Sequence, residues 1–207
     1  MSDAAPVAAP PLDDLVRLCA AVCLHDRERL AELAAGLAPH ARAPRLRETL
    51  LQCHLFCGFP RTIAALDALS AHGLHIAGEE DPDPADPGAR GAPLFDAIYG
   101  AGADGVREHL AGLDPTFARW VAEHAYGRVL SRTGLSGAER ELLAVAALAA
   151  TGHERQLASH ARGAVRLGAA PGDVAGVLDA IAGSIDHERL VRARSVVERF
   201  ARPDPRR

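Results

Sequence analysis

The sequence contains no lysine, and arginine supplies all 23 of its basic residues. Asp and Glu together number 27, which gives a formal net charge of −4 at pH 7. A chain with this balance lacks the basic patch by which proteins bind nucleic acid or anionic membranes, so we expect neither partner. We attribute the exclusive use of arginine, together with the abundance of alanine, to compositional bias rather than to a binding site.

Long apolar runs are also missing. No uncharged apolar stretch reaches the roughly 18 residues that a membrane-spanning helix requires, which excludes a transmembrane protein. The N-terminal MSDAAPVAAPP has neither the basic start nor the apolar run of a signal peptide. We therefore expect a soluble, cytoplasmic protein.

Several motifs that mark catalytic or cofactor sites are absent. The chain has no P-loop, no GxSxG, and no HExxH or HxxxH pair. These absences argue against a nucleotide cofactor, a nucleophile elbow and a helical zinc site. We predict no cofactor and no metal.

The patterns that are present predict an all-α fold. Apolar residues make up 48% of the 207 residues and recur at helical spacing, without convincing two-residue alternation. Asp114-Pro115 and the capping-box pattern Ser136 to Glu139 predict helix starts. The chain divides into a disordered N-terminus at 1–11, a first helical repeat at 12–76, an acidic Pro/Gly-rich linker at 77–93, and a second helical repeat at 94–201 that carries the predicted site.

An offset of 127 residues aligns the first repeat with the second without a gap. Identical residues then include the pairs Leu15/Leu142, Leu30/Leu157, Gly36/Gly163, Pro44/Pro171 and Leu51/Leu178. The shared glycine and proline favour an ancient duplication over chance matches in an alanine-rich chain.

The four cysteines lie in two C-x3-C pairs in the first repeat. Cys19, Cys23 and Cys53 align with Ala146, Ala150 and Ala180, and Cys57 aligns with Ser184. Small residues in the second repeat favour core packing for the thiols. The functional alternative is a thiol pair or a metal site that draws on His25 or His54.

Two ionisable residues of the second repeat are predicted to point inward. Helical spacing places His160 with Leu157, Ala161 and Ala164, and it places Glu141 with Ala144, Val145 and Leu148. A buried Glu–His pair would orient the imidazole for proton transfer. The structural alternative is a hydrogen-bonded core histidine with a solvated glutamate near a helix N-terminus.

The stretch EHAYGRVLSRTGLSGAERELLAVAALAATGHERQLASHARGAVRLGA resembles the carboxymuconolactone decarboxylase family, which includes the alkylhydroperoxidase D-like proteins. The resemblance rests on Tyr126-Gly127, Ser131-Arg132, Gly134-Leu135, Arg140 before Leu142-Leu143, and the group of Leu157, His160 and Arg162. RETLLQCHLFCGFPRTIAAL in the first half is similar to another stretch of the family. The resemblance implies two tandem helical modules, the first degenerate, and a homo-oligomer such as a trimer or hexamer.

The resemblance also implies a function. His160 would transfer protons without a cofactor, Glu141 would orient it, and the substrate would be a small carboxylated lactone or acid. Arg140, Arg162 and Tyr126 are the candidate substrate-binding residues. In the peroxidase branch a C-x-x-C pair precedes the histidine, but this chain has His153 and Gln156 there, so we do not expect a classical CxxC thiol peroxidase.

Two other functions stay open. A non-catalytic helical oligomer scaffold would explain why the first repeat has lost the histidine. An antioxidant or redox protein would use the first-repeat cysteines. If the halves have specialised, Gly58-Phe59-Pro60 of the first is predicted to help wall the site around His160.

Overall fold

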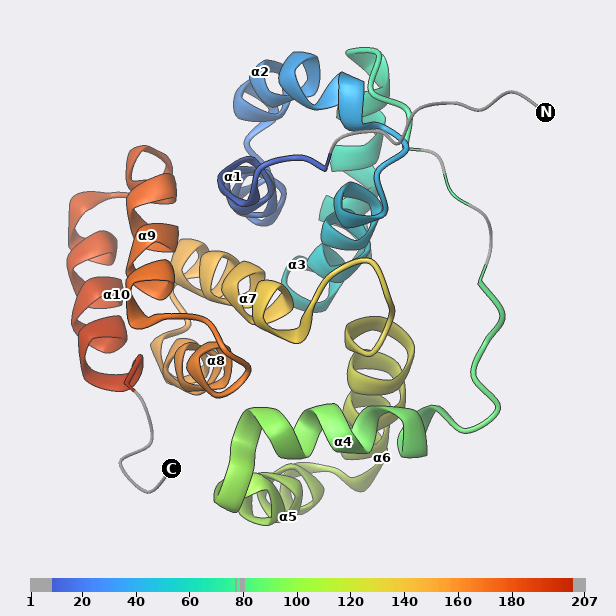
Figure 1. The fold of residues 1–207 in the computed structure, drawn as a ribbon, viewed down its shortest axis with the longest axis vertical. Helices are drawn as coiled ribbons and strands as arrows, with labels where there is room; N and C mark the ends of the chain where they lie inside the picture. Colours follow the sequence, from blue (N-terminus) through green and yellow to red (C-terminus); the bar gives the residue numbers. More distant parts are fainter. Residues whose placement is uncertain (1–8, 77, 79–80, 203–207) are drawn as a thin grey trace.

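The structure is a computed structural model, and it describes residues 9–76, 78 and 81–202. Within those residues every regular element is helical and no β-strand occurs, which confirms the all-α prediction (Figure 1). The predicted disorder at residues 1–8 lies outside the described part of the chain. The elements are α1 (Leu12–Leu24), α2 (Arg27–Leu37), η1 (Ala38–His40), α3 (Pro44–Ala71), α4 (Pro87–Tyr99), η2 (Gly100–Gly102), α5 (Ala103–Leu113), α6 (Pro115–Trp120), η3 (Val121–Leu130), α7 (Gly137–Thr151), α8 (Glu154–Arg166), α9 (Pro171–Ile181), η4 (Ala182–Ser184) and α10 (His187–Phe200).

Helix α7 occupies the centre of the molecule (Figure 1). It packs against α1 and α3 on one side and against α8, α9 and α10 on the other. Every residue from Arg140 to Ala150 is buried, and most of these are alanine or leucine. Small side chains allow neighbouring helices to approach closely, so α7 holds the two halves together through one hydrophobic core.

The structure contains the two helix starts that were predicted from the sequence. The Ser136 hydroxyl accepts a hydrogen bond from the Glu139 backbone N–H at 3.2 Å, and the Ser136 N–H donates to the Glu139 carboxylate at 2.7 Å. This reciprocal pair is the predicted capping box. Asp114 caps α6 by accepting from the Phe117 N–H at 2.7 Å.

The predicted linker is wrong at its C-terminal end. Helix α4 begins at Pro87, whereas the composition placed residues 77–93 outside the helices. The Asp86 carboxylate accepts a hydrogen bond from the Ala89 N–H at 2.9 Å, and Pro87 occupies the first helical turn. Both are helix-start features, because an N-cap acid satisfies an orphan N–H and proline has no N–H to lose.

Helix α3 bends at the Gly58-Phe59-Pro60 sequence. Gly58 has φ 77° and ψ 166°, a conformation that residues with a Cβ rarely adopt. Pro60 follows within the same element and removes one backbone donor. The bend divides α3 into two arms with different neighbours.

The helix bounds follow the 127-residue offset. Helix α1 ends at Leu24 and α7 ends at the aligned Thr151. Helices α2 and α8 begin at the aligned residues Arg27 and Glu154, and α3 and α9 begin at the aligned prolines. This agreement fits a duplication, and the duplication itself stays a prediction.

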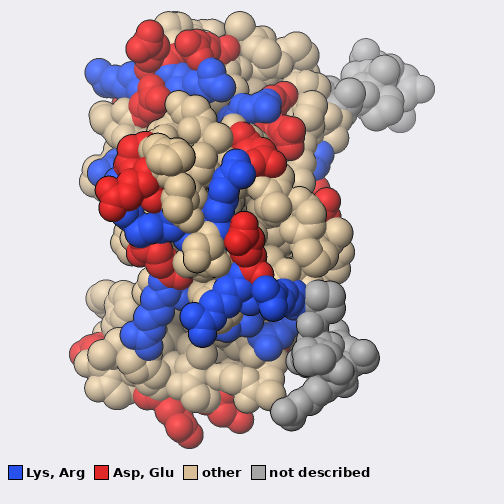
Figure 2. All heavy atoms as spheres, turned by 90° about the vertical axis from the view of Figure 1, so that its left-hand side faces the viewer, with Lys and Arg blue, Asp and Glu red and all other residues tan. Residues whose placement is uncertain are grey.

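None of the helices in the described residues is long and apolar enough to cross a membrane. On the face that carries α9 and α10, arginines lie beside acidic residues (Figure 2). Arg194 pairs with Asp179 at 2.7 Å, and Arg192 pairs with Glu154 at 3.1 Å. The positive charge of these arginines is therefore partly neutralised by acidic neighbours.

Candidate active site

His160 and Glu141 form a buried pair between α8 and α7. The His160 Nδ1 atom lies 2.9 Å from Glu141 Oε2, within hydrogen-bond distance. Glu141 is 1% exposed and His160 is 9% exposed, which confirms the predicted inward direction of both side chains. Because an ionised carboxylate only accepts hydrogen bonds, Nδ1 carries the proton and donates it. This arrangement leaves Nε2 as the ring atom for further chemistry.

The pair shifts the pKa of His160 upward. Burial alone would lower this pKa, but the charge of Glu141 and the hydrogen bond to its carboxylate together outweigh that effect. The pKa of His160 therefore lies above its ordinary value of 6.5. The corresponding contribution to folding stability is complete below pH 6.5 and is lost as the pH rises through the folded-state pKa.

Gly163 on α8 makes room for the Glu141 carboxylate. A Cβ atom added at Gly163 would lie 2.4 Å from Glu141 Oε2 and 2.9 Å from the Ile98 Cγ2 atom. Both distances are shorter than non-bonded contacts allow. The glycine therefore permits the close approach that the Glu141–His160 hydrogen bond requires.

Replacing Gly163 by alanine should break this hydrogen bond. The new methyl group displaces the Glu141 carboxylate, while His160 stays buried, so the His160 pKa should fall below 6.5. An NMR titration of the His160 ring protons measures the change. Gly36 is the matched control in α2, because an added Cβ there meets no atom within 4 Å. A Gly163→Ala protein whose His160 pKa stays above 6.5 would contradict this account.

His160 lines a cavity of about 580 Å³. The walls are mainly apolar and come from α3, α4, α5, α6, η3 and α8. Phe56 places its ring edge-on to the imidazole, with 6.1 Å between the ring centroids. The lining residues are Leu55, Phe56, Tyr99, Val106, His109, Leu110, Leu113, Phe117, Val121, Ala125, Tyr126, Leu130, Arg155, Gln156, Ser159 and His160.

The first half contributes to this cavity through residues other than the predicted ones. Leu55 and Phe56 of α3 line the cavity, one turn before the Gly58-Phe59-Pro60 bend. Phe59 is 62% exposed and stacks on His54 with ring centroids 5.0 Å apart. The bend is therefore not part of the cavity lining, although its helix is.

Arg155 is a cavity residue that sequence reasoning missed. It lies in the first turn of α8 and lines the cavity together with Ser159, which follows it by four residues. Within the described part of the chain its guanidinium forms no ion pair. An exposed arginine without an acidic partner can bind a carboxylate from a ligand. The spacing to Ser159 was visible in the sequence, but the cavity was not.

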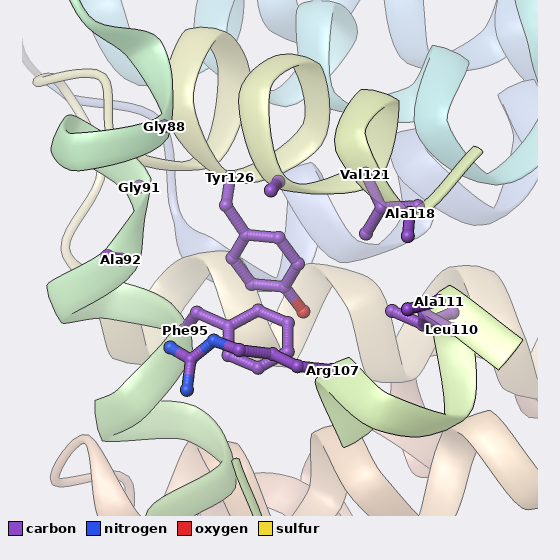
Figure 3. A pocket seen from close by; sticks show the side chains of 11 residues that line it. Gly88, Gly91, Ala92, Phe95, Arg107, Leu110, Ala111, Ala118, Val121 and Tyr126 are labelled. Carbon is purple, nitrogen blue, oxygen red and sulfur yellow. The ribbon is translucent and has the colours of Figure 1, made fainter. Parts of the chain in front are cut away.

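Tyr126 lies in the cavity wall, where the Tyr126 hydroxyl donates to the Tyr99 hydroxyl at 2.9 Å. Burial is the main cause of a raised pKa for both tyrosines, and the charge of Glu141 adds to it. A second, largely apolar cavity of about 320 Å³ adjoins the first and shares Leu110, Val121 and Tyr126 with it. Figure 3 shows the Tyr126 ring projecting from η3 toward Phe95 and Arg107 at this second cavity.

Arg140 does not lie in the cavity with His160, although it was a predicted substrate-binding residue. It is 1% exposed and faces α3, where its Nη2 atom donates to Glu48 Oε2 at 2.9 Å and to the Arg132 carbonyl at 2.9 Å. Arg132 also donates to Glu48, at 2.9 and 3.0 Å. Because its charge is already paired in the core, Arg140 joins α3, α7 and the loop between η3 and α7 rather than binding a ligand.

Arg162 also lies outside the His160 cavity. It lines an adjoining cavity of about 240 Å³, which shares Tyr99, Val106 and Ser159 with the His160 cavity. The Arg162 guanidinium lies over the Phe200 ring, 4.7 Å from the centroid. Of the predicted substrate-binding residues, Tyr126 alone lines the cavity together with His160.

All four cysteines are free thiols between α1 and α3. The Cys19 and Cys53 sulfur atoms are 3.7 Å apart, and the two helices bring Cys23 next to them. Hydrogen bonds from Cys23 and Cys53 lower the pKa of Cys19 to about 5, although burial opposes this. His54 instead lies 2.7 Å from His124, Nε2 to Nε2, and His25 ends α1, so the thiol cluster contains neither predicted histidine partner.

Comparison with known proteins gives two findings. Residues 115–199, which include Glu141 and His160, match the carboxymuconolactone decarboxylase family. The chain is also similar to Peroxisomal protein 2 of Schizosaccharomyces pombe, with 33% identity over 132 residues. That match covers 61% of this chain and 62% of the relative, so the chain spans less than two thirds of the relative's length.

Proposed function

We propose that the chain is a cofactor-independent lyase or isomerase, because residues 115–199 match the carboxymuconolactone decarboxylase family. Its substrate would be a small carboxylated lactone or acid. His160 is the general acid and base, Glu141 is the residue that positions it, and Arg155 takes the anchoring role that the sequence assigned to Arg140 and Arg162.

One observation carries this proposal: the hydrogen-bonded His160–Glu141 pair opens onto a cavity that also holds an unpaired arginine. The raised pKa of His160 keeps a useful fraction of imidazolium near neutral pH. Apolar walls exclude water and strengthen the electrostatic interactions inside the cavity. A core histidine that only packs would not need a cavity beside its ring.

The proton transfer is assigned to the His160 Nε2 atom. In a decarboxylation, the bond between the ring carbon and the carboxylate breaks, and its electron pair moves into the conjugated lactone carbonyl. The carboxylate leaves as CO2. The imidazolium of His160 then delivers one proton from Nε2 to a carbon atom of the resulting anion, while the Nδ1–H group stays hydrogen-bonded to Glu141. Arg155 would hold a carboxylate that the substrate retains, because an ion pair to the departing group would oppose its loss.

An ultraviolet assay tests the proposal: carboxymuconolactone is incubated with the purified wild-type chain, and the loss of its absorbance is followed. Turnover without added metal or cofactor is the expected result. If neither this lactone nor a panel of related lactone acids is consumed, the proposal fails. The non-catalytic scaffold would then be the better account.

Replacing Arg155 by glutamine should weaken substrate binding more than it slows the chemical step. Loss of a charge-assisted contact that is made equally in the ground and transition states raises KM and leaves kcat nearly unchanged. For a contact that contributes about 1.4 kcal/mol to binding, KM should rise about tenfold. Arg162→Gln is the matched control, because Arg162 lies outside the His160 cavity. Equal KM values for Arg155→Gln and the wild type would remove Arg155 from the binding role.

We also propose that the chain is a homo-oligomer, as the family resemblance implied. Large apolar side chains are exposed on α3, α5 and α6, and those of Leu113 and Phe117 reach the cavity. Such exposure is costly in a monomer and supports a subunit contact near the site. Sedimentation velocity should show trimers or hexamers, and a monomer at micromolar concentration would contradict the proposal. The exposed large apolar residues on these three helices are Phe59, Ile63, Leu66, Leu113, Phe117 and Trp120.

The cellular location is a proposal as well. The cytoplasm is the location that we expected from the sequence, while the name of the Schizosaccharomyces pombe relative supports the peroxisome. Fluorescence imaging of a fusion protein distinguishes the two compartments.

A further inference from the structure

All four cysteines of the chain converge on one place in the fold. They come from two turns of α1 and from α3, and no other cysteine occurs in the sequence. At each aligned position the second repeat has alanine or serine. Because alanine fills the corresponding helix faces, packing alone does not require sulfur at four positions.

The geometry of the buried thiols suits a metal ion. The Sγ atoms of Cys19, Cys23 and Cys53 all lie within 4.8 Å of one another. Two thiolates on one zinc ion, with metal–sulfur bonds of about 2.3 Å and tetrahedral angles, are about 3.8 Å apart. The 3.7 Å between Cys19 Sγ and Cys53 Sγ matches that edge, and the two distances to Cys23 Sγ exceed it by at most about 1 Å.

Cys57 connects this cluster to the surface. It is half-buried and lines a cavity of about 480 Å³ together with Phe56, Arg61 and His153. Its Sγ atom is 3.2 Å from the Cys53 carbonyl oxygen and 3.6 Å from the Thr62 hydroxyl. An ion that enters through the cavity therefore meets Cys57 before it meets the buried thiols.

A guanidinium lies beside the cluster. Arg61 Nη1 donates a hydrogen bond to the Cys23 carbonyl oxygen. Three or four thiolates around one metal ion carry a net negative charge, which is costly to bury without a neighbouring cation. Arg61 supplies that cation on the side from which the ion enters.

We propose that Cys19, Cys23 and Cys53 form a binding site for one soft d10 cation, with Cys57 at its entrance. Soft thiolate ligands select such ions, chiefly Cu⁺ and Zn²⁺. The three buried thiols suit Cu⁺. Zn²⁺, which takes four ligands in closed sites, would need Cys57 as the fourth. This site lies apart from the His160 cavity and does not depend on the proposed lyase function.

The test is a competition titration of the reduced, full-length chain. Zn²⁺ is offered against a chromophoric zinc chelator, and Cu⁺ is offered without oxygen against bathocuproine disulfonate. One equivalent of Cu⁺ or Zn²⁺ should move from the chelator to the chain and should raise the unfolding temperature. If neither ion moves to the chain, the four thiols only pack and the proposal is overturned.

Variants show which thiols hold the ion. Cys19→Ala and Cys53→Ala, which introduce the residue of the aligned positions, should lose stoichiometric binding while circular dichroism shows unchanged helicity. Cys57→Ala should abolish Zn²⁺ binding and spare Cu⁺ binding, which separates the two ions. Unaltered binding in both Cys19→Ala and Cys53→Ala would place the ion elsewhere and overturn the assignment. Turnover by the His160 site should be the same with and without the ion.

Discussion

The Glu48→Ala variant should lose about 3–5 kcal/mol of its free energy of unfolding. Glu48 is 3% exposed and accepts hydrogen bonds from both Arg140 and Arg132. Removing it leaves the Arg140 guanidinium buried in the core without its acidic partner. Arg140 then keeps only neutral partners, namely the Gln52 side chain and the carbonyls of Arg132 and Thr133.

Urea unfolding followed by circular dichroism measures this loss. Asp81→Ala is the control, because Asp81 also pairs with Arg132 but lies at the surface, where solvent screens ion pairs. Its unfolding midpoint should stay close to that of the wild type. The double variant Glu48→Leu, Arg140→Met should recover much of the loss, since it leaves no uncompensated charge. Equal midpoints for Glu48→Ala and Asp81→Ala would show that the buried network contributes little.

The inward pair at the site could be predicted from the sequence because it depends on local periodicity. Positions one helical turn apart share a face, so the apolar neighbours of His160 and Glu141 fixed the direction of both side chains. The hydrogen bond between them was one of two open alternatives. Helical spacing alone does not give the distance between two helices, which here depends on Gly163.

The role of Arg140 could not be predicted, because its partner lies 92 residues away in the sequence. The position of Arg140 next to Glu141 in the sequence suggested a substrate-binding residue. The fold instead places Glu48 of α3 against it, and a buried charge with a buried partner has a structural role. The stretch of this chain that resembles the family therefore includes residues that connect helices, such as Arg140 and Arg132, as well as residues of the cavity.

Arg155 and the start of α4 were missed for different reasons. The cavity around Arg155 is assembled from six elements between α3 and α8, and no local sequence pattern predicts that these elements meet. The start of α4 did have local signals, Asp86 as N-cap and Pro87 in the first turn, but the proline-rich composition of the segment outweighed them. Composition describes an average over a segment, whereas capping depends on single positions.

The pH dependence of turnover should follow His160. Its raised pKa implies that the imidazolium form, which donates the proton in the proposed mechanism, persists above pH 6.5 and is lost as the pH rises through the folded-state pKa. The turnover rate should therefore decrease at alkaline pH, with a midpoint at the pKa of His160. The charge of Glu141 and the hydrogen bond to its carboxylate cause the upward shift of the pKa, so this alkaline decrease is a property of the His160–Glu141 pair.

The most direct test of the account is the turnover of carboxymuconolactone by the His160→Gln variant, compared with the wild type in the same ultraviolet assay. Glutamine keeps a polar side chain beside Glu141 but cannot transfer a proton near neutral pH. We predict that kcat falls by about 10²–10⁴-fold while the unfolding midpoint changes little. A folded His160→Gln protein that turns over substrate at the wild-type rate would contradict the assignment of His160 as the general acid and base.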